Sequence, residues 1–253
     1  NAVYARAADV VTLLFTAGRA IQTPSVTIAG NPAAVSGGPL AWRAEYTVQA
    51  GDPEGPVAFV ISGIEDLDGI MAADVSATTD GSAVTIDLTA PAAVIAGEPT
   101  GISGDTVLNV TVSGADVLYY RYKAGAAAAT DCATAAGYSA DVPSATAITD
   151  DISGLADGAV NLCVVGRDTA GNYQPYSAAT AATWTKDTSA PVATITGQPT
   201  GVSGTTALNV DVAGADIQYY RYKVGETAAT DCVSAAGYGV AVAESANITD
   251  DIS

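Results

Sequence analysis

Histidine is absent from this chain of 253 residues. Its absence excludes a Ser-His-Asp or Cys-His nucleophile system and a histidine-ligated zinc or iron site. Basic side chains are scarce as well, with 9 Lys and Arg against 27 Asp and Glu and a net charge of −18. Such a surface repels nucleic acids and anionic lipids and attracts hard cations. Carboxylate-pair catalysis stays open, but no pair in the sequence points to it, so we expect no enzyme and no nucleic-acid partner.

Long apolar runs and large aromatic side chains are also few. No run approaches the roughly 20 residues that a membrane-spanning helix needs, so we expect no membrane span. There are only 2 Phe and 2 Trp, while Ala and Val dominate the apolar residues. Small residues of this kind suit several thin β-cores better than one large core. Gly, Thr, Ser, Asp and Pro recur at short intervals, as turn residues do between short strands.

An internal duplication organises the chain. Residues 91–153 return as residues 191–253, an offset of 191 − 91 = 100 residues without a gap. About 60% of the aligned positions agree, which excludes chance. A period near 100 residues is typical of one immunoglobulin-like sandwich. We therefore predict three modules, at 1–89, 90–189 and 190–253, with proline after each joint stiffening the connection.

The first segment predicts strands at 10–16, 25–29, 41–48, 57–61 and 82–88, separated by turns and without helical periodicity. The fold class that follows is all-β, with tandem immunoglobulin-like β-sandwiches arranged as beads on a rod. The chain begins at Asn1 without a signal-peptide pattern, and the second repeat copy stops at residue 253. We expect a piece of a longer repeat protein, or a filament subunit whose incomplete modules are completed by strands from a neighbour.

Three stretches resemble a known family. They are VTLLFTA at 11–17, AIQTPSVTIAG at 20–30 and YTVQAGDPEG at 46–55, and the later GRDTAGN at 166–172 looks related. Together they resemble the bacterial immunoglobulin-like repeat modules of large surface adhesins and other extracellular proteins, the later repeats being immunoglobulin- or fibronectin-like. Modules of that family normally have a further strand before the one that begins at residue 10. The resemblance therefore implies that the first module of this chain lacks its first strand. The turn that is usual in that family, Asp-x-Ala-Gly-Asn, is altered to DLDGI at 66–70 of this chain.

The cysteines predict a disulfide between Cys132 and Cys163. Cys232 matches Cys132, and the counterpart of Cys163 would stand at 163 + 100 = 263, so truncation leaves Cys232 unpaired. Two buried free thiols are the alternative. A disulfide indicates an oxidising compartment, so we predict an extracellular protein or one on a bacterial cell surface.

Acidic clusters raise the prospect of calcium, which binds six to eight oxygen ligands. The candidate metal ligands are Glu65, Asp66, Asp68, Asp87 and Asp187, and solvated acidic turns are the alternative interpretation. In the turn at 168–172, Asp168 is expected to bond turn amides and Gly171 to take a positive φ.

The strand at 119–123, Tyr-Tyr-Arg-Tyr-Lys, returns unchanged at 219–223. Alternation places Tyr120 and Tyr122 on one face, which we expect to be the core, and the remaining side chains on the other. Candidate binding residues for a sugar or a neighbouring chain are Tyr119, Arg121, Tyr219 and Arg221.

The function predicted is a structural or adhesive repeat segment of an extracellular bacterial surface protein or filament, whose partners are further copies or neighbouring modules. The alternative is a glycan- or protein-binding accessory module of a secreted multidomain enzyme.

Overall fold

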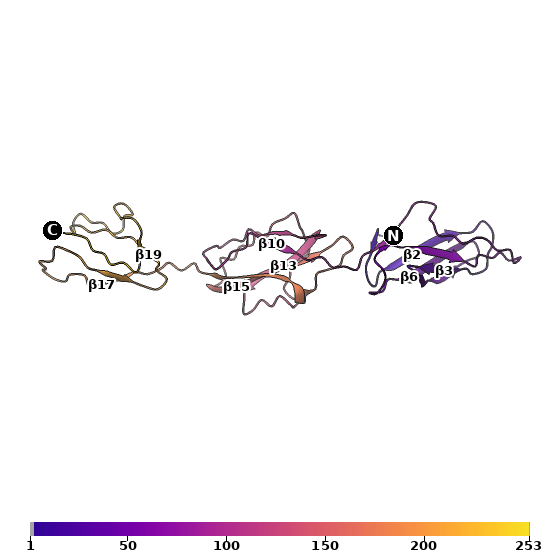
Figure 1. Ribbon diagram of the computed structural model, residues 1–253, viewed down its shortest axis with the longest axis horizontal. Coiled ribbons are helices and arrows are strands. Elements are labelled where there is room, and N and C mark those ends of the chain that lie inside the picture. Colours follow the sequence, from indigo (N-terminus) through magenta and orange to yellow (C-terminus); the bar gives the residue numbers. More distant parts are fainter. Residues whose placement is uncertain (1–2, 253) are drawn as a thin grey trace. The chain divides into compact units, whose positions relative to one another are not determined.

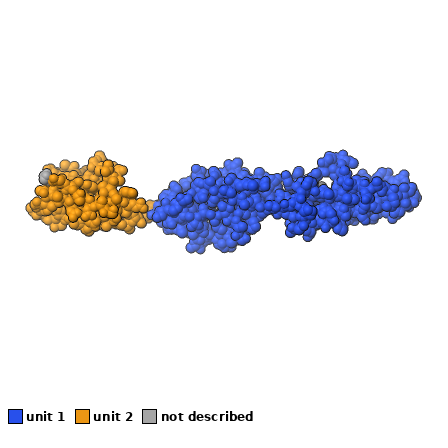
Figure 2. All heavy atoms as spheres, viewed as in Figure 1, with its two compact units in different colours: residues 1–187 blue, residues 188–253 orange. Residues whose placement is uncertain are grey.

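The computed structural model describes residues 3–252, which form β-strands and turns. Within this range the sole helix is η1 (Tyr176–Ala178), a single 3-10 turn. Among the same residues, none of the helical structure has the length and apolar character needed to cross a bilayer. The predicted all-β fold class is confirmed. The chain divides into two compact units, Asn1–Asp187 and Thr188–Ser253 (Figure 2).

The first part of unit 1, residues 3–89, is called here the first sandwich. It contains three sheets of three strands each, in the orders β2-β6-β5, β4-β3-β8 and β1-β9-β7 (Figure 1). The strands are β1 (Tyr4–Ala5), β2 (Val10–Thr16), β3 (Ser25–Ile28), β4 (Asn31–Pro32), β5 (Ala34–Gly37), β6 (Ala41–Thr47), β7 (Gly55–Pro56), β8 (Phe59–Ser62) and β9 (Thr85–Ile86). A short strand therefore precedes Val10, and it pairs in parallel with β9.

The first sandwich follows the predicted strands where long partners exist. Strand β2 has the predicted bounds because β6 pairs with it antiparallel along its whole length, from Val10 opposite Thr47 to Thr16 opposite Ala41. In β6, Trp42 and Ala44 are buried while Arg43 between them is exposed, as alternation requires. The strand predicted at 82–88 shrinks to β9, because its partners β1 and β7 are only two residues long each.

The second part of unit 1, residues 90–187, is called the second sandwich. A five-stranded sheet in the order β11-β16-β15-β13-β14 packs with the pair β10-β12. The strands are β10 (Val94–Ala96), β11 (Ile102–Ser103), β12 (Thr111–Ser113), β13 (Tyr119–Ala126), β14 (Val142–Pro143), β15 (Gly158–Arg167) and β16 (Thr180–Lys186).

Strand β15 is the centre of the second sandwich. It pairs antiparallel with β13 on one side and with β16 on the other. Val160, Leu162 and Val164 are buried in the same core cluster as Tyr120 and Trp184. Burial of each aliphatic side chain of this size contributes about 1.5–3 kcal/mol. This core is distinct from that of the first sandwich, which is built from residues between Ala5 and Ile86.

Unit 2 repeats part of the second sandwich. Its strands are β17 (Thr194–Thr196), β18 (Asp211–Ala213), β19 (Tyr219–Tyr220) and β20 (Val242–Ala243) (Figure 1). Strand β17 pairs with β18 and β19 with β20, in the registers that β10, β12, β13 and β14 use 100 residues earlier. Its core contains Val210, Val212, Tyr220 and Ile248. Each of the three predicted modules therefore contains its own apolar cluster.

Candidate functional site

The turn at 168–172 is the most highly organised polar feature of unit 1. Asp168 is buried, and its Oδ1 accepts hydrogen bonds from the backbone N–H groups of Gly171 at 2.6 Å and Asn172 at 2.8 Å. Gly171 takes a φ of +94°, which glycine adopts at little cost. The predicted roles of Asp168 and Gly171 in this turn are confirmed.

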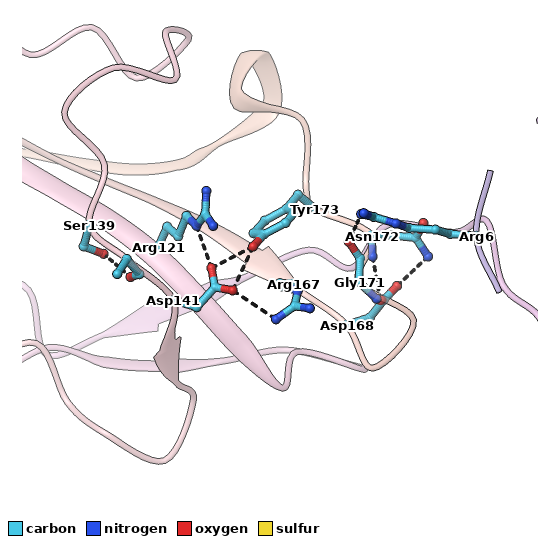
Figure 3. A network of polar contacts seen from close by, with 10 residues as sticks. Arg6, Arg121, Ser139, Asp141, Arg167, Asp168, Gly171, Asn172 and Tyr173 are labelled. Atoms are coloured by element: carbon cyan, nitrogen blue, oxygen red, sulfur yellow. Dashed lines mark hydrogen bonds and ion pairs between the residues drawn. The ribbon is translucent and has the colours of Figure 1, made fainter. Parts of the chain in front are cut away.

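Asn172 connects this turn to the first sandwich. Its Nδ2 donates one hydrogen bond to Asp168 Oδ2 at 2.8 Å (Figure 3). It donates another to the backbone carbonyl of Asp87 at 2.9 Å. The Arg6 guanidinium donates a hydrogen bond to the carbonyl oxygen of Gly171. The same turn thus closes the second sandwich and holds the first one, and we call the contacts of Arg6 and Asn172 the joint contacts.

The joint also brings carboxylates together. Burial raises the pKa of Asp87 above its usual range, and the nearby charge of Asp168 raises it further. The hydrogen bond that Asp87 accepts from the N–H of Thr89 opposes this shift in pKa. The two sandwiches are therefore joined at a point where negative charge is held in a partly desolvated place.

The corresponding turn of the first sandwich, at 66–70, has the carboxylate but lacks the asparagine. Asp66 accepts hydrogen bonds from the N–H groups of Ile70 at 2.9 Å and Asp68 at 3.0 Å, and from the Arg19 guanidinium at 2.8 Å. These contacts, led by the bond from Ile70 and followed by Arg19, hold the pKa of Asp66 below its usual range. Ile70 stands where the later turn has Asn172, so this turn closes locally without an amide that could reach another module.

The candidate calcium ligands lie in three places. Glu65, Asp66 and Asp68 lie on the turn of the first sandwich, Asp87 follows β9, and Asp187 follows β16. Within residues 3–252 no three or more Asp, Glu, Cys or His side chains form a group that could hold a metal ion. The Asp66 oxygens already accept bonds from the protein itself. The described residues therefore do not bring the predicted ligands together in one metal site, and unfolding experiments can test whether Ca²⁺ binds.

A second polar network surrounds Asp141 on the outer face of β13. Its carboxylate accepts bonds from Arg121 Nε at 2.5 Å, from an Arg167 guanidinium N–H at 3.0 Å and from the Tyr173 hydroxyl at 2.8 Å (Figure 3). The Arg121 guanidinium also lies 4.5 Å from the centre of the Tyr173 ring, and that of Arg167 lies 5.4 Å from the centre of the Tyr119 ring. The two arginines are thus paired with a carboxylate and with tyrosine rings of the same sandwich.

The electrostatics of this network favour the ionised carboxylate. Burial by itself would raise the pKa of Asp141, but hydrogen bonds from Tyr173 and Arg121 and the charges of both arginines lower it below its usual range. Burial and the bond to Asp141 raise the pKa of the Tyr173 hydroxyl. These shifts favour the ionised form of Asp141 and the protonated hydroxyl of Tyr173.

The network accounts for two of the four candidate binding residues, Arg121 and Tyr119, which are half-buried. Its other members, Asp141, Arg167 and Tyr173, were not singled out from the sequence. Tyr173 lies 52 positions after Arg121, and no local spacing indicates that they meet.

The other two candidate binding residues lie in a different environment. In unit 2, Ala241 stands at the position that corresponds to Asp141. The Tyr219 side chain is exposed, at 67%, and Arg221 is exposed as well. The two copies of the YYRYK strand therefore present different outer faces.

The predicted inner face of this strand is confirmed. Tyr120 is fully buried, and its hydroxyl donates to the carbonyl oxygen of Thr146 at 2.7 Å. Tyr122 packs against the same core, and its hydroxyl donates to Asp150 Oδ1 at 2.6 Å.

The structure contains the predicted disulfide, between Cys132 and Cys163, with their Cα atoms 5.3 Å apart. Cys163 lies on the buried strand β15, so the bond fastens the long loop after β13 to the centre of the sheet. Cys232 is free and exposed, as the repeat offset predicted.

Comparisons with known proteins give likenesses of shape at low identity. No protein-family model matches the chain, and no curated protein matches it. Fibronectin(III)-like modules of Clostridium thermocellum CbhA are 10% identical, with 72% of this chain and 87% of that one covered and a TM-score of 0.34. A tetra-tandem repeat from the extending region of a large adhesion protein is 19% identical, with 85% and 55% covered and a TM-score of 0.29.

A third similar structure is the SGBP-B protein of a Bacteroides ovatus mixed-linkage glucan utilization locus, in complex with a mixed-linkage heptasaccharide. It is 17% identical, with 75% of this chain and 44% of that one covered and a TM-score of 0.23. The chain thus spans about half the length of the second structure and less than half of the third. At these identities and TM-scores, none of the three likenesses assigns a function.

Proposed function

We propose that this chain is a structural, adhesive repeat segment of an extracellular bacterial surface protein or filament, in which joined sandwiches act as a stiff spacer. One observation carries the proposal. The Asp168 turn, which closes the second sandwich, also holds the first sandwich through Asn172 and Arg6. A contact of this kind restricts hinge motion between consecutive modules. A spacer needs this restriction in order to hold its length and to bear load.

Three further features support this role. The module is repeated with an offset of 100 residues, so length can be gained by adding copies. The Cys132–Cys163 disulfide is typical of an oxidising compartment and supports placement outside the cell. The best-ordered ionisable cluster, around Asp141, is satisfied by its own arginines and tyrosine, which supports a non-catalytic role.

The spacer proposal is tested by the stiffness of the joint. Two spin labels would be attached in a Cys232→Ser background, one in each sandwich, at the exposed positions Ser36 and Ser177. Double electron-electron resonance would then measure the distance between the two labels. We expect a narrow distance distribution for the native joint and a broad one after Asn172→Ala. The matched control is Asn161→Ala, which removes an asparagine that bonds Thr130 O within the second sandwich. A native distribution as broad as that of Asn172→Ala would contradict the proposal.

A second candidate function, a glycan- or protein-binding accessory module of a secreted multidomain enzyme, is favoured by unit 2. Tyr219 and Arg221 are both exposed, and Ala241 stands at the position of the carboxylate that engages Arg121 in the other copy. An exposed tyrosine beside an arginine can stack on a sugar ring. Glycan-array binding that is lost in Tyr219→Ala but kept in Tyr119→Ala would support this function, and binding insensitive to both would remove it.

A further inference from the structure

Gln174 is a buried polar residue that ties separate segments of the second sandwich together. Its side chain is 5% exposed, and a buried amide of this kind needs hydrogen-bond partners. Its Oε1 accepts bonds from the backbone N–H groups of Ala93 at 2.9 Å and Gly166 at 3.1 Å. Its Nε2 donates to the carbonyl oxygen of Ala178 at 2.6 Å. One side chain thus connects the residue just before β10, where the chain enters this sandwich, to the end of β15.

Both backbone groups of Ala93 are held by side chains. Its N–H donates to Gln174, and its carbonyl oxygen accepts a bond from the Thr180 hydroxyl at 2.6 Å. Pro91, two residues earlier, is buried. The last part of the connection between the two sandwiches is therefore fixed to the second sandwich before β10 begins.

The first part of this connection is fixed to the first sandwich. Glu54 Oε1 accepts bonds from the N–H of Leu88 and from the Thr89 hydroxyl, both at 2.8 Å. We call residues 88–92 the linker. It lies between the two residues that the hairpin of the second sandwich holds, one before it and one after it.

The contacts of the linker close a ring. From Asp87 the chain runs through the linker to Ala93, and the bond from Ala93 leads to Gln174. Two positions back along the hairpin, Asn172 bonds the carbonyl of Asp87 and completes the ring. A free chain from Asp87 to Ala93 can span up to about 20 Å. Bonds at both ends hold the linker to one hairpin, whereas loss of either bond opens the ring.

The equivalent hairpin of the first sandwich has the same backbone bond but neither amide side chain. Gln174 and Ala72 each donate their backbone N–H to the carbonyl oxygen eight positions earlier, at 2.8 Å in both hairpins. Ala72 stands where the second sandwich has Gln174, and Ile70 stands where it has Asn172. The hairpin therefore forms without these two amides, and their bonds to Asp87 and Ala93 are not needed to make the turn.

We propose that Gln174 is a positioning residue of the joint, which holds the hairpin against Ala93 so that Asn172 stays bonded to Asp87. The two amides act as a pair, because loss of either opens the same ring. The pattern Asp-x-Ala-Gly-Asn-x-Gln at 168–174 is thus the form of the hairpin that clamps a linker, in contrast to the form at 66–72. This inference rests on the proposed spacer function, since it names what keeps the joint stiff.

The test replaces Gln174 by methionine, which fills a similar volume but cannot bridge two backbone N–H groups. Spin labels at the exposed positions Ser36 and Ser153 measure the distance between the sandwiches in a Cys232→Ser background, away from η1, which Gln174 contacts. We expect Gln174→Met to broaden the distance distribution toward longer distances, within the roughly 20 Å that a free linker spans. Asn172→Ile/Gln174→Ala, which carries the two side chains of the first hairpin, should be no broader than Gln174→Met.

Tyr120→Phe is the matched control, because it removes a buried hydrogen bond of the same sandwich that does not involve the linker. Trp184 fluorescence in urea measures the stability of both variants, and only Gln174→Met should alter the joint. A narrow native distribution that stays narrow in Gln174→Met would overturn the inference and leave the spacer function in place. A double variant much broader than Gln174→Met would also overturn it, since the two bonds would then act independently. A broad native distribution would contradict the spacer function itself.

Discussion

Removal of the Cys132–Cys163 disulfide offers the sharpest measure of what stabilises the second sandwich. The bond spans 31 residues, and in the chain-entropy model closure of a loop of this length lowers the entropy of the unfolded chain by about 12 cal/mol/K. At 25 °C this corresponds to about 3.7 kcal/mol of stability. We therefore expect the variant Cys132→Ala/Cys163→Ala to lose about 3–4 kcal/mol in the free energy of unfolding of this module.

The assay must isolate one module, because a chain with several cores does not unfold in two states. Trp184 is buried in the second sandwich and Trp42 in the first, so in a Trp42→Phe background the fluorescence reports on the second sandwich. With a urea m-value of about 1–2 kcal/mol/M, the midpoint should fall by roughly 2–4 M.

Reduction of the native chain with dithiothreitol should produce the same shift without changing a side chain, and Cys232→Ser should leave the midpoint in place. A loss below about 1 kcal/mol would refute the loop-closure reasoning, because the bond would then not constrain the unfolded chain.

Three other outcomes are expected. Tyr120→Phe should cost about 1–2 kcal/mol, since it leaves the carbonyl of Thr146 without its buried donor, and Tyr119→Phe should cost less; Trp184 fluorescence measures both. The lowered pKa of Asp141 means that its stabilising effect is present above the unfolded pKa, near 3.9, and is lost as pH falls through the folded pKa; Asp141→Asn should lower the urea midpoint at pH 7 and flatten its acid dependence. Because the Asp66 oxygens already accept protein hydrogen bonds, thermal unfolding should have the same midpoint with Ca²⁺ as with chelator, and a higher midpoint with Ca²⁺ would establish a calcium site.

Local chemistry and the repeat determined much of this protein in advance. Alternating small apolar residues specify strands, so the all-β class and the bounds of β2 follow from the sequence alone. The offset of 100 residues identified Cys132 and Cys163 as partners and Cys232 as the thiol left over. The Asp168 turn was likewise predictable, because its hydrogen bonds join residues within four positions.

Contacts between distant residues were decided only by the tertiary structure. The bond from Asn172 to the carbonyl of Asp87 spans 85 positions. Its acceptor is a backbone carbonyl that any residue could supply, so no side-chain pattern in the sequence predicts it. Asp141 gathers Arg121, Arg167 and Tyr173 from three separate segments. The outer faces of the identical strands YYRYK differ because their surroundings differ, with Asp141 beside Arg121 in one copy and Ala241 at the corresponding position of the other. Sequence specifies which face of a strand is apolar, whereas the neighbours that fold against it decide what each face does.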